Sequence, residues 1–181
     1  MKTTTLKKIE RLDHDSSHWW RLLNALKKFE ADDEPLPYSR ILEACGLKFA
    51  LWATRTEEDF KWVKELAIAY ARHISYLMSD PRSVKALDVA ERFLAGEADK
   101  EELEAARKDA YAAVIADVPP VSYAAASCAY SAVYYSDSSI LSEISDGAID
   151  ASDHAADACD EYYIYHTERD WQEAEFLKFV G

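Results

Sequence analysis

The sequence predicts an all-α protein, a single-domain helical bundle of about seven helices over residues 1–181, with long Ala/Tyr-rich helices toward the C-terminus. A length of 181 residues fits one domain. Four glycines and five prolines are too few for the tight turns of a sheet protein of this size. Apolar residues recur at spacings of three and four, and no stretch alternates as a half-buried strand does.

The predicted elements follow one another with short connections. Residues 1–15 are expected to be a flexible N-terminal segment. The predicted helices then cover residues 16–29, 39–54, 56–79, 83–95, 99–118, the uncharged segment 118–136, and one or two long helices after residue 137.

The first two helices are placed by their caps and breakers. Ser16 and Ser17 are typical N-cap residues, and the two prolines in the loop 32–37 prevent the first helix from continuing. Gly46 lies inside the second predicted helix, where a glycine costs about 1 kcal/mol relative to alanine. We therefore expect Gly46 to allow the close approach of a neighbouring element.

The next three helices have boundary residues of known types. The segment 56–59 resembles a capping box at the start of the third helix, which stops at Asp80–Pro81. Gly96 is well placed as a left-handed C-cap of the fourth helix. Asp99 and Glu102 have the spacing of a capping box and predict the start of the fifth.

Charge divides the chain into two unequal parts. Residues 1–108 hold 20 acidic and 19 basic residues, whereas residues 109–181 hold 14 acidic residues and only Arg169 and Lys178 as bases. The second part is therefore an acidic subregion with a net charge of −12, close to the total of −13. Direct binding to nucleic acid or to an anionic membrane requires a basic face, so the composition argues against both.

Cysteine content and hydropathy indicate a cytoplasmic protein. Cys45, Cys128 and Cys159 are odd in number and far apart, which argues against a disulfide framework or a zinc site. The N-terminus lacks the apolar region of a signal peptide. The uncharged segment 118–136 contains no Leu, Ile or Phe, so a buried helix fits it better than a membrane span.

Four segments carry a resemblance to a known family. They are Cys45–Trp52 (CGLKFALW), Leu87–Ala98 (LDVAERFLAGEA), Glu101–Arg107 (EELEAAR) and Trp171–Leu177 (WQEAEFL). Together with the Ala-rich C-terminal region, they resemble small all-helical immunity proteins of bacteria and phages over roughly residues 40–180. The resemblance implies an all-helical cytosolic protein that binds and neutralises a toxin or similar effector, and it implies no particular site residue. The chain differs from that family in its acidic, Tyr-rich C-terminal helices.

Carboxylates recur at helical spacing near the C-terminus and form what we call the acidic stripe. On a helix its members share one face over about 25 Å, and like charges one turn apart each destabilise a helix by about 0.2–0.5 kcal/mol. The acidic stripe consists of Glu143, Asp146, Asp150, Asp153, Asp157 and Asp160. The opposite, apolar side of the same helix consists of Leu141, Ile144, Ala148, Ala151, Ala155, Cys159 and Tyr162.

We interpret the acidic stripe as a docking face for a protein with a basic surface, with Tyr134 and Tyr135 as aromatic anchors. A special case is nucleic-acid mimicry, in which the carboxylates stand in for phosphates. An ordinary solvated face is the competing interpretation. If the stripe is self-repulsive, changing its aspartates to asparagine should leave the protein at least as stable.

Two other function classes stay open. Imidazole and carboxylate ligands at helical spacing suit several divalent metals, and the candidate ligands are Asp150, His154, Asp157 and Glu161. No Gly-x-Ser-x-Gly motif, phosphate loop or paired Glu-x-x-His motif occurs. The alternative is thus a helical metal-binding protein, or an enzyme whose site is not visible in motifs.

Taken together, these features predict a non-enzymatic inhibitory protein-binding module of the immunity or phage anti-defence type. Its expected partner is a toxin, nuclease or nucleic-acid-binding defence effector with a basic surface. No cofactor is expected.

Overall fold

The all-α prediction is confirmed, but the predicted number of seven helices is too low. The computed structural model of the chain contains, in its described residues, ten α-helices, two short 3-10 helices and two strands of two residues each. No helix in this part of the chain is both long and apolar enough to cross a membrane. The described residues are 1–12, 16–116, 120–138, 141–160 and 165–181.

The elements form two groups along the chain. The first group consists of β1 (Thr3–Thr4), α1 (Leu6–Glu10), α2 (Ser16–Leu26), β2 (Leu36–Pro37), α3 (Tyr38–Cys45), α4 (Leu47–Ala53) and the 3-10 helix η1 (Thr54–Thr56). The second group consists of α5 (Lys61–His73), the 3-10 helix η2 (Ser75–Leu77), α6 (Pro81–Ala95), α7 (Lys100–Ala116), α8 (Pro120–Tyr134), α9 (Leu141–Asp160) and α10 (Tyr165–Val180).

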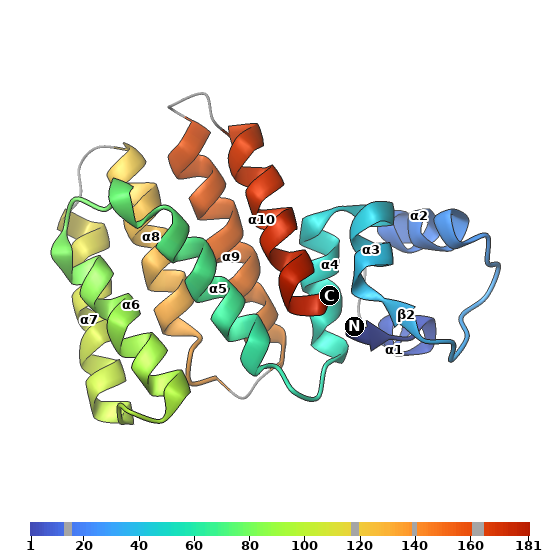
Figure 1. Cartoon of the computed structure of the whole chain (residues 1–181), viewed down its shortest axis with the longest axis horizontal. Coiled ribbons are helices and arrows are strands. Elements are labelled where there is room, and N and C mark those ends of the chain that lie inside the picture. Colours follow the sequence, from blue (N-terminus) through green and yellow to red (C-terminus); the bar gives the residue numbers. More distant parts are fainter. Residues whose placement is uncertain (13–15, 117–119, 139–140, 161–164) are drawn as a thin grey trace.

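Helix α9 lies in the middle of this arrangement. Helices α6 and α7 form one edge of the molecule, and α1, α2 and the two strands form the opposite end (Figure 1). Between them, α9 contacts α8, α5, α10 and α4, and it also contacts η1. Its polar face is therefore bordered by elements from both halves of the chain.

Gly46 interrupts what the sequence predicts as one helix over 39–54, and the reason differs from the one expected. The backbone of Gly46 has a φ of +84°, which ends α3 and lets α4 begin at the next residue. A Cβ atom at this position would meet no atom within 4 Å. Close approach of a neighbour is therefore not its role, and the positive φ accounts for the glycine.

The first residues form regular structure, and the predicted start of α5 is corrected. Residues 3–10 form β1 and α1, in which Leu6 and Ile9 are fully buried, while the expected flexibility of residues 1–15 stays a prediction. The segment 56–59 is not a capping box, because α5 begins only at Lys61. The backbone N–H of Lys61 instead donates to the Asp59 carboxylate over 3.2 Å.

The caps predicted for α6 and α7 are confirmed. Gly96 has the left-handed conformation of a C-cap at the end of α6. Asp99 and Glu102 form a reciprocal capping box, because each side chain accepts a hydrogen bond from the other residue's backbone N–H, over 2.8 and 3.3 Å. The local sequence thus determines where α6 ends and where α7 begins.

Small side chains let α8 and α9 pack closely. The apolar side predicted for α9 is buried at Ile144, Ala148, Ala151, Ala155 and Cys159, while Tyr162 lies outside the described residues. The facing surface of α8 is formed mainly by buried alanines, serines and Cys128. These short side chains bring the two helix backbones together, and this packing fixes which side of α9 is turned outward.

The two ends of the described chain meet beside an aromatic cluster. The backbone N–H of Lys2 donates to the carbonyl of Val180 over 2.7 Å, and the Tyr38 N–H donates to the carbonyl of Lys2. Tyr38, Trp62 and Phe176 pack edge-on or tilted against one another next to this junction. The first strand and the last helix are thus held against the same core.

Candidate functional site

Two members of the acidic stripe are held by bases from other elements. Asp146 pairs with Arg55 of η1 over 2.5 Å, and Arg55 also donates to the Ser145 hydroxyl over 2.8 Å. Asp153 accepts from Lys48 of α4 over 2.9 Å and from Arg169 of α10 over 2.7 Å. Burial opposes ionisation of Asp153, but these two hydrogen bonds hold its pKa below the usual value. We call Asp146 and Asp153 the clamped pair.

The clamped pair changes the expected energetics of the stripe. Within α9 alone its carboxylates repel one another, but Lys48, Arg55 and Arg169 approach them from three other elements. Substituting asparagine for Asp146 or Asp153 therefore removes an ion pair as well as a repulsion. The expectation that every stripe aspartate can be neutralised without loss of stability is corrected for these two residues.

Three other stripe carboxylates are exposed and form no ion pair with a described lysine or arginine. We call Asp150, Asp157 and Asp160 the exposed trio. Partial burial raises the pKa of Asp150, an effect that nearby His154 opposes. At the start of the helix, Glu143 accepts a hydrogen bond from the Ser138 hydroxyl over 2.6 Å. The stripe thus contains both ion-paired and exposed carboxylates.

Tyr135 lies beside the stripe, whereas Tyr134 is directed toward α7. The Tyr135 side chain packs on Gly147 of α9 so closely that a Cβ there would lie 2.5 Å from its Cδ2 atom. Burial, and next the charges of Asp150 and Asp146, raise the pKa of Tyr135. The Tyr134 ring meets Tyr135 edge-on and lies 5.4 Å from the Arg107 guanidinium. Of the two predicted anchors, only Tyr135 borders the carboxylates.

A hollow of about 200 Å³ adjoins the other side of the stripe. We call it the aromatic hollow, because stacked rings from α2 and α4 form much of its wall. Sequence reasoning missed it, since His18 appears isolated in the sequence and Phe49 and Trp52 look like ordinary core positions. The hollow is lined by His18, Lys48, Phe49, Trp52 and Ile149.

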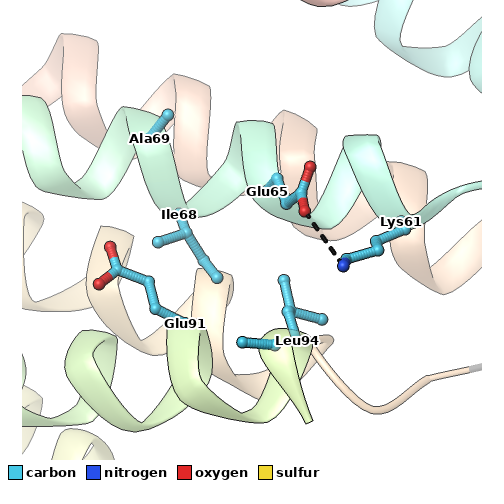
Figure 2. Close-up of a pocket in the computed structure, with 7 residues that line it drawn as sticks. Lys61, Glu65, Ile68, Ala69, Glu91 and Leu94 are labelled. Atoms are coloured by element: carbon cyan, nitrogen blue, oxygen red, sulfur yellow. Dashed lines mark ion pairs between the residues drawn. The ribbon is translucent and has the colours of Figure 1, made fainter. Parts of the chain in front are cut away.

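A larger hollow of about 330 Å³ lies between α5 and α6, away from the stripe (Figure 2). Its apolar part includes Ile68 and Leu94, and the carboxylates of Glu65 and Glu91 stand at its rim. Glu65 pairs with Lys61 over 3.7 Å, and Glu91 pairs with Arg72 over 2.8 Å. Both carboxylates at this hollow thus form ion pairs within the protein.

The proposed metal ligands are not gathered into a site. Asp150, His154 and Asp157 lie on α9, but no group of three His, Cys, Asp or Glu side chains in the described part of the chain is arranged to hold a metal ion. The fourth candidate, Glu161, lies outside the described residues.

A buried polar network under α9 is a second feature that sequence reasoning missed. Glu168 of α10 is only 3% exposed, and its carboxylate accepts from Gln172 over 2.9 Å and lies 3.2 Å from His73 of α5. The His73 ring stacks on Trp171 with the ring centres 3.6 Å apart. Burial raises the pKa of Glu168 to about 7 and lowers that of His73. Burial therefore favours the uncharged form of both side chains.

This network reaches the clamped pair through α10. The amide of Gln172 donates to the Ser152 carbonyl over 3.0 Å, and Arg169 donates to both the Ser152 hydroxyl and Asp153. The sequence pattern alone does not indicate these contacts, because they join side chains of two separate helices that lie 16 to 20 residues apart along the chain. The network fixes the orientation of the α9 polar face relative to α10.

Comparison of the chain with family models, with curated proteins and with solved structures found no match.

Proposed function

We propose that the chain is a non-enzymatic protein-binding module that inhibits a partner with a basic surface, acting in the cytoplasm in the manner of an immunity or phage anti-defence protein. The observation that carries the proposal is the division of the acidic stripe. Asp146 and Asp153 serve the fold through ion pairs, whereas Asp150, Asp157 and Asp160 point outward with no described lysine or arginine paired to them.

Electrostatics favours a basic protein as the partner. Asp150 and Asp157 are two helical turns apart, about 10 Å at 1.5 Å per residue. Such a row of carboxylates attracts a basic patch and accelerates association, especially at low salt. The same row can occupy a nucleic-acid-binding cleft, with carboxylates in the place of phosphates, and Tyr135 borders it as an aromatic contact.

Stability separates the two roles within the stripe. We expect the double variant Asp146→Asn/Asp153→Asn to lose about 2 kcal/mol of unfolding free energy, because it breaks partly buried ion pairs with Arg55 and Arg169. Neutralising the exposed trio should change the unfolding free energy by less than about 0.5 kcal/mol. Denaturant titration of both variants measures this difference, and equal losses would contradict the division. The exposed-trio variant is Asp150→Asn/Asp157→Asn/Asp160→Asn.

Binding should show the opposite pattern. A partner retained from bacterial lysate by the parent protein, once identified by mass spectrometry, is titrated calorimetrically against the variants at two salt concentrations. The exposed-trio variant should bind at least tenfold more weakly and with a smaller salt dependence. A charge-matched control should bind like the parent, and an equal loss in the control would show that only net charge matters. The control changes one residue of the α6–α7 connection and two of α7, and it is Glu97→Gln/Glu101→Gln/Asp109→Asn.

A further inference from the structure

The aromatic hollow has a wall of stacked rings that ends at a cation. The rings of His18 and Phe49 stack with their centres 5.3 Å apart and their planes 7° from parallel. Phe49 stacks in turn on Trp52 at 5.1 Å, and the Arg55 guanidinium lies 5.7 Å from the Trp52 ring. Because Arg55 also pairs with Asp146, this wall is fixed to the stripe.

The hollow and the stripe share helix α9. Ile149 lines the hollow, and the next residue, Asp150, belongs to the exposed trio. Lys48 stands at the rim with its ammonium group on Asp153. An apolar depression therefore opens directly beside a row of carboxylates, and one segment of a partner can reach both.

We propose that the aromatic hollow receives one large apolar side chain of a basic partner segment, whose lysine or arginine residues pair with Asp150 and Asp157. This inference rests on the proposed function and names the chemistry of its partner. Apolar depressions with a few polar groups around them are typical pockets for an anchoring side chain. The apolar lining therefore calls for a side chain of leucine size or larger, and the neighbouring carboxylates call for basic residues beside it.

Charge alone supplies such a complex with only part of its affinity. Exposed ion pairs contribute little net binding energy, since both partners give up hydration and side-chain freedom. Burying an apolar side chain supplies a larger gain, and it fixes the register in which the cations meet the carboxylates. A cationic side chain is the poorer occupant of the hollow, because Lys48 already places a positive charge at its rim.

The test uses two synthetic helical peptides with the same lysines seven residues apart, one with a central leucine and one with alanine at that position. Calorimetry against the parent protein should show the leucine peptide binding about tenfold more tightly. In Ile149→Ala this preference should fall to about twofold or less. In the control Ile115→Ala, which truncates an exposed isoleucine on α7, it should be unchanged. The indole resonance of Trp52 should shift with the leucine peptide.

The outcomes separate the two proposals. If the parent binds both peptides equally and the exposed-trio variant binds both more weakly, the hollow does not receive an anchoring side chain and the proposed function stands. If the leucine preference is present but the exposed-trio variant binds both peptides as the parent does, the pairing with Asp150 and Asp157 is wrong and the proposed function fails with it. Absence of binding by both peptides at millimolar concentration overturns the inference.

Discussion

Replacing Glu168 with glutamine should stabilise the protein by about 3 kcal/mol more at pH 8 than at pH 4, relative to the parent. Burial raises the pKa of Glu168 to about 7, whereas a glutamate in an unfolded chain has a pKa of about 4.3. Between these values the native state holds a proton that the unfolded chain has released. The contribution of Glu168 to stability therefore falls as the pH rises through this window, and glutamine does not titrate.

Glutamine is a close replacement because it resembles the protonated acid. Its carbonyl can accept from Gln172 and its amide can donate to His73, in the places of the two carboxyl oxygens. Burial lowers the pKa of His73, and the contribution of His73 to stability therefore rises with pH, opposite to that of Glu168. Because His73 is present in both proteins, its contribution largely cancels when their stabilities are compared. Cys159 and Arg169 also face the carboxyl group and are unchanged.

Denaturant titration of parent and variant from pH 4 to pH 8 measures the divergence. Glu173→Gln, on the same helix, is the control for loss of one carboxylate. Curves for parent and Glu168→Gln that run parallel across this range would contradict a buried, protonated Glu168. If the stabilities of the parent and Glu168→Gln instead differ more as the pH falls, the Glu168 carboxylate is stabilised in its ionised form.

The second large effect is expected at Gly147. Gly147→Ala should lower the unfolding free energy by about 2 kcal/mol, although alanine is favoured over glycine in a helix by about 1 kcal/mol. The added Cβ would lie 2.5 Å from Cδ2 and 2.8 Å from Cβ of Tyr135. The Cβ atom of Tyr135, which follows the last residue of α8, moves only with its backbone, so the end of α8 must move away from α9 and the packing of the two helices there must loosen.

A double-mutant cycle identifies the cause. Tyr135→Gly, which also removes the clashing Cβ atom, should recover most of the loss in the Gly147→Ala background, with a coupling energy of about 2 kcal/mol. Gly96→Ala is the control, because its cost comes from a left-handed backbone and not from contact with a neighbour. Tyr135→Gly should not relieve the cost of Gly96→Ala. A Gly147→Ala protein as stable as the parent would show that the two helices are not in tight contact there.

Local sequence predicts the helices where their ends are determined by neighbouring residues. Gly96 and the pair Asp99 and Glu102 are examples, because each cap is completed within five residues along the chain. Gly46 is the exception, since a glycine in a helical pattern is consistent with close packing as well as with a break. The two strands have only two residues each and leave no periodic pattern.

The candidate site could be predicted only in part, because its energetics depend on residues that are distant in the sequence. The spacing of the stripe carboxylates does place them on one helix. No spacing indicates that Arg55 meets Asp146 or that Lys48 meets Asp153, and these contacts separate structural from exposed carboxylates. The aromatic hollow likewise needs α2, α4 and α9 to come together.

The hydrogen bond between Lys2 and Val180 bears on the order in which the protein folds. Neighbouring helices such as α8 and α9 are joined by short connections, and their contacts form at little entropic cost. The junction of the chain ends requires closure of nearly the whole chain. We therefore expect the Lys2 amide to become protected in pulse-labelling hydrogen exchange after the amides of α9. Simultaneous protection would show that the first strand docks together with the central helices.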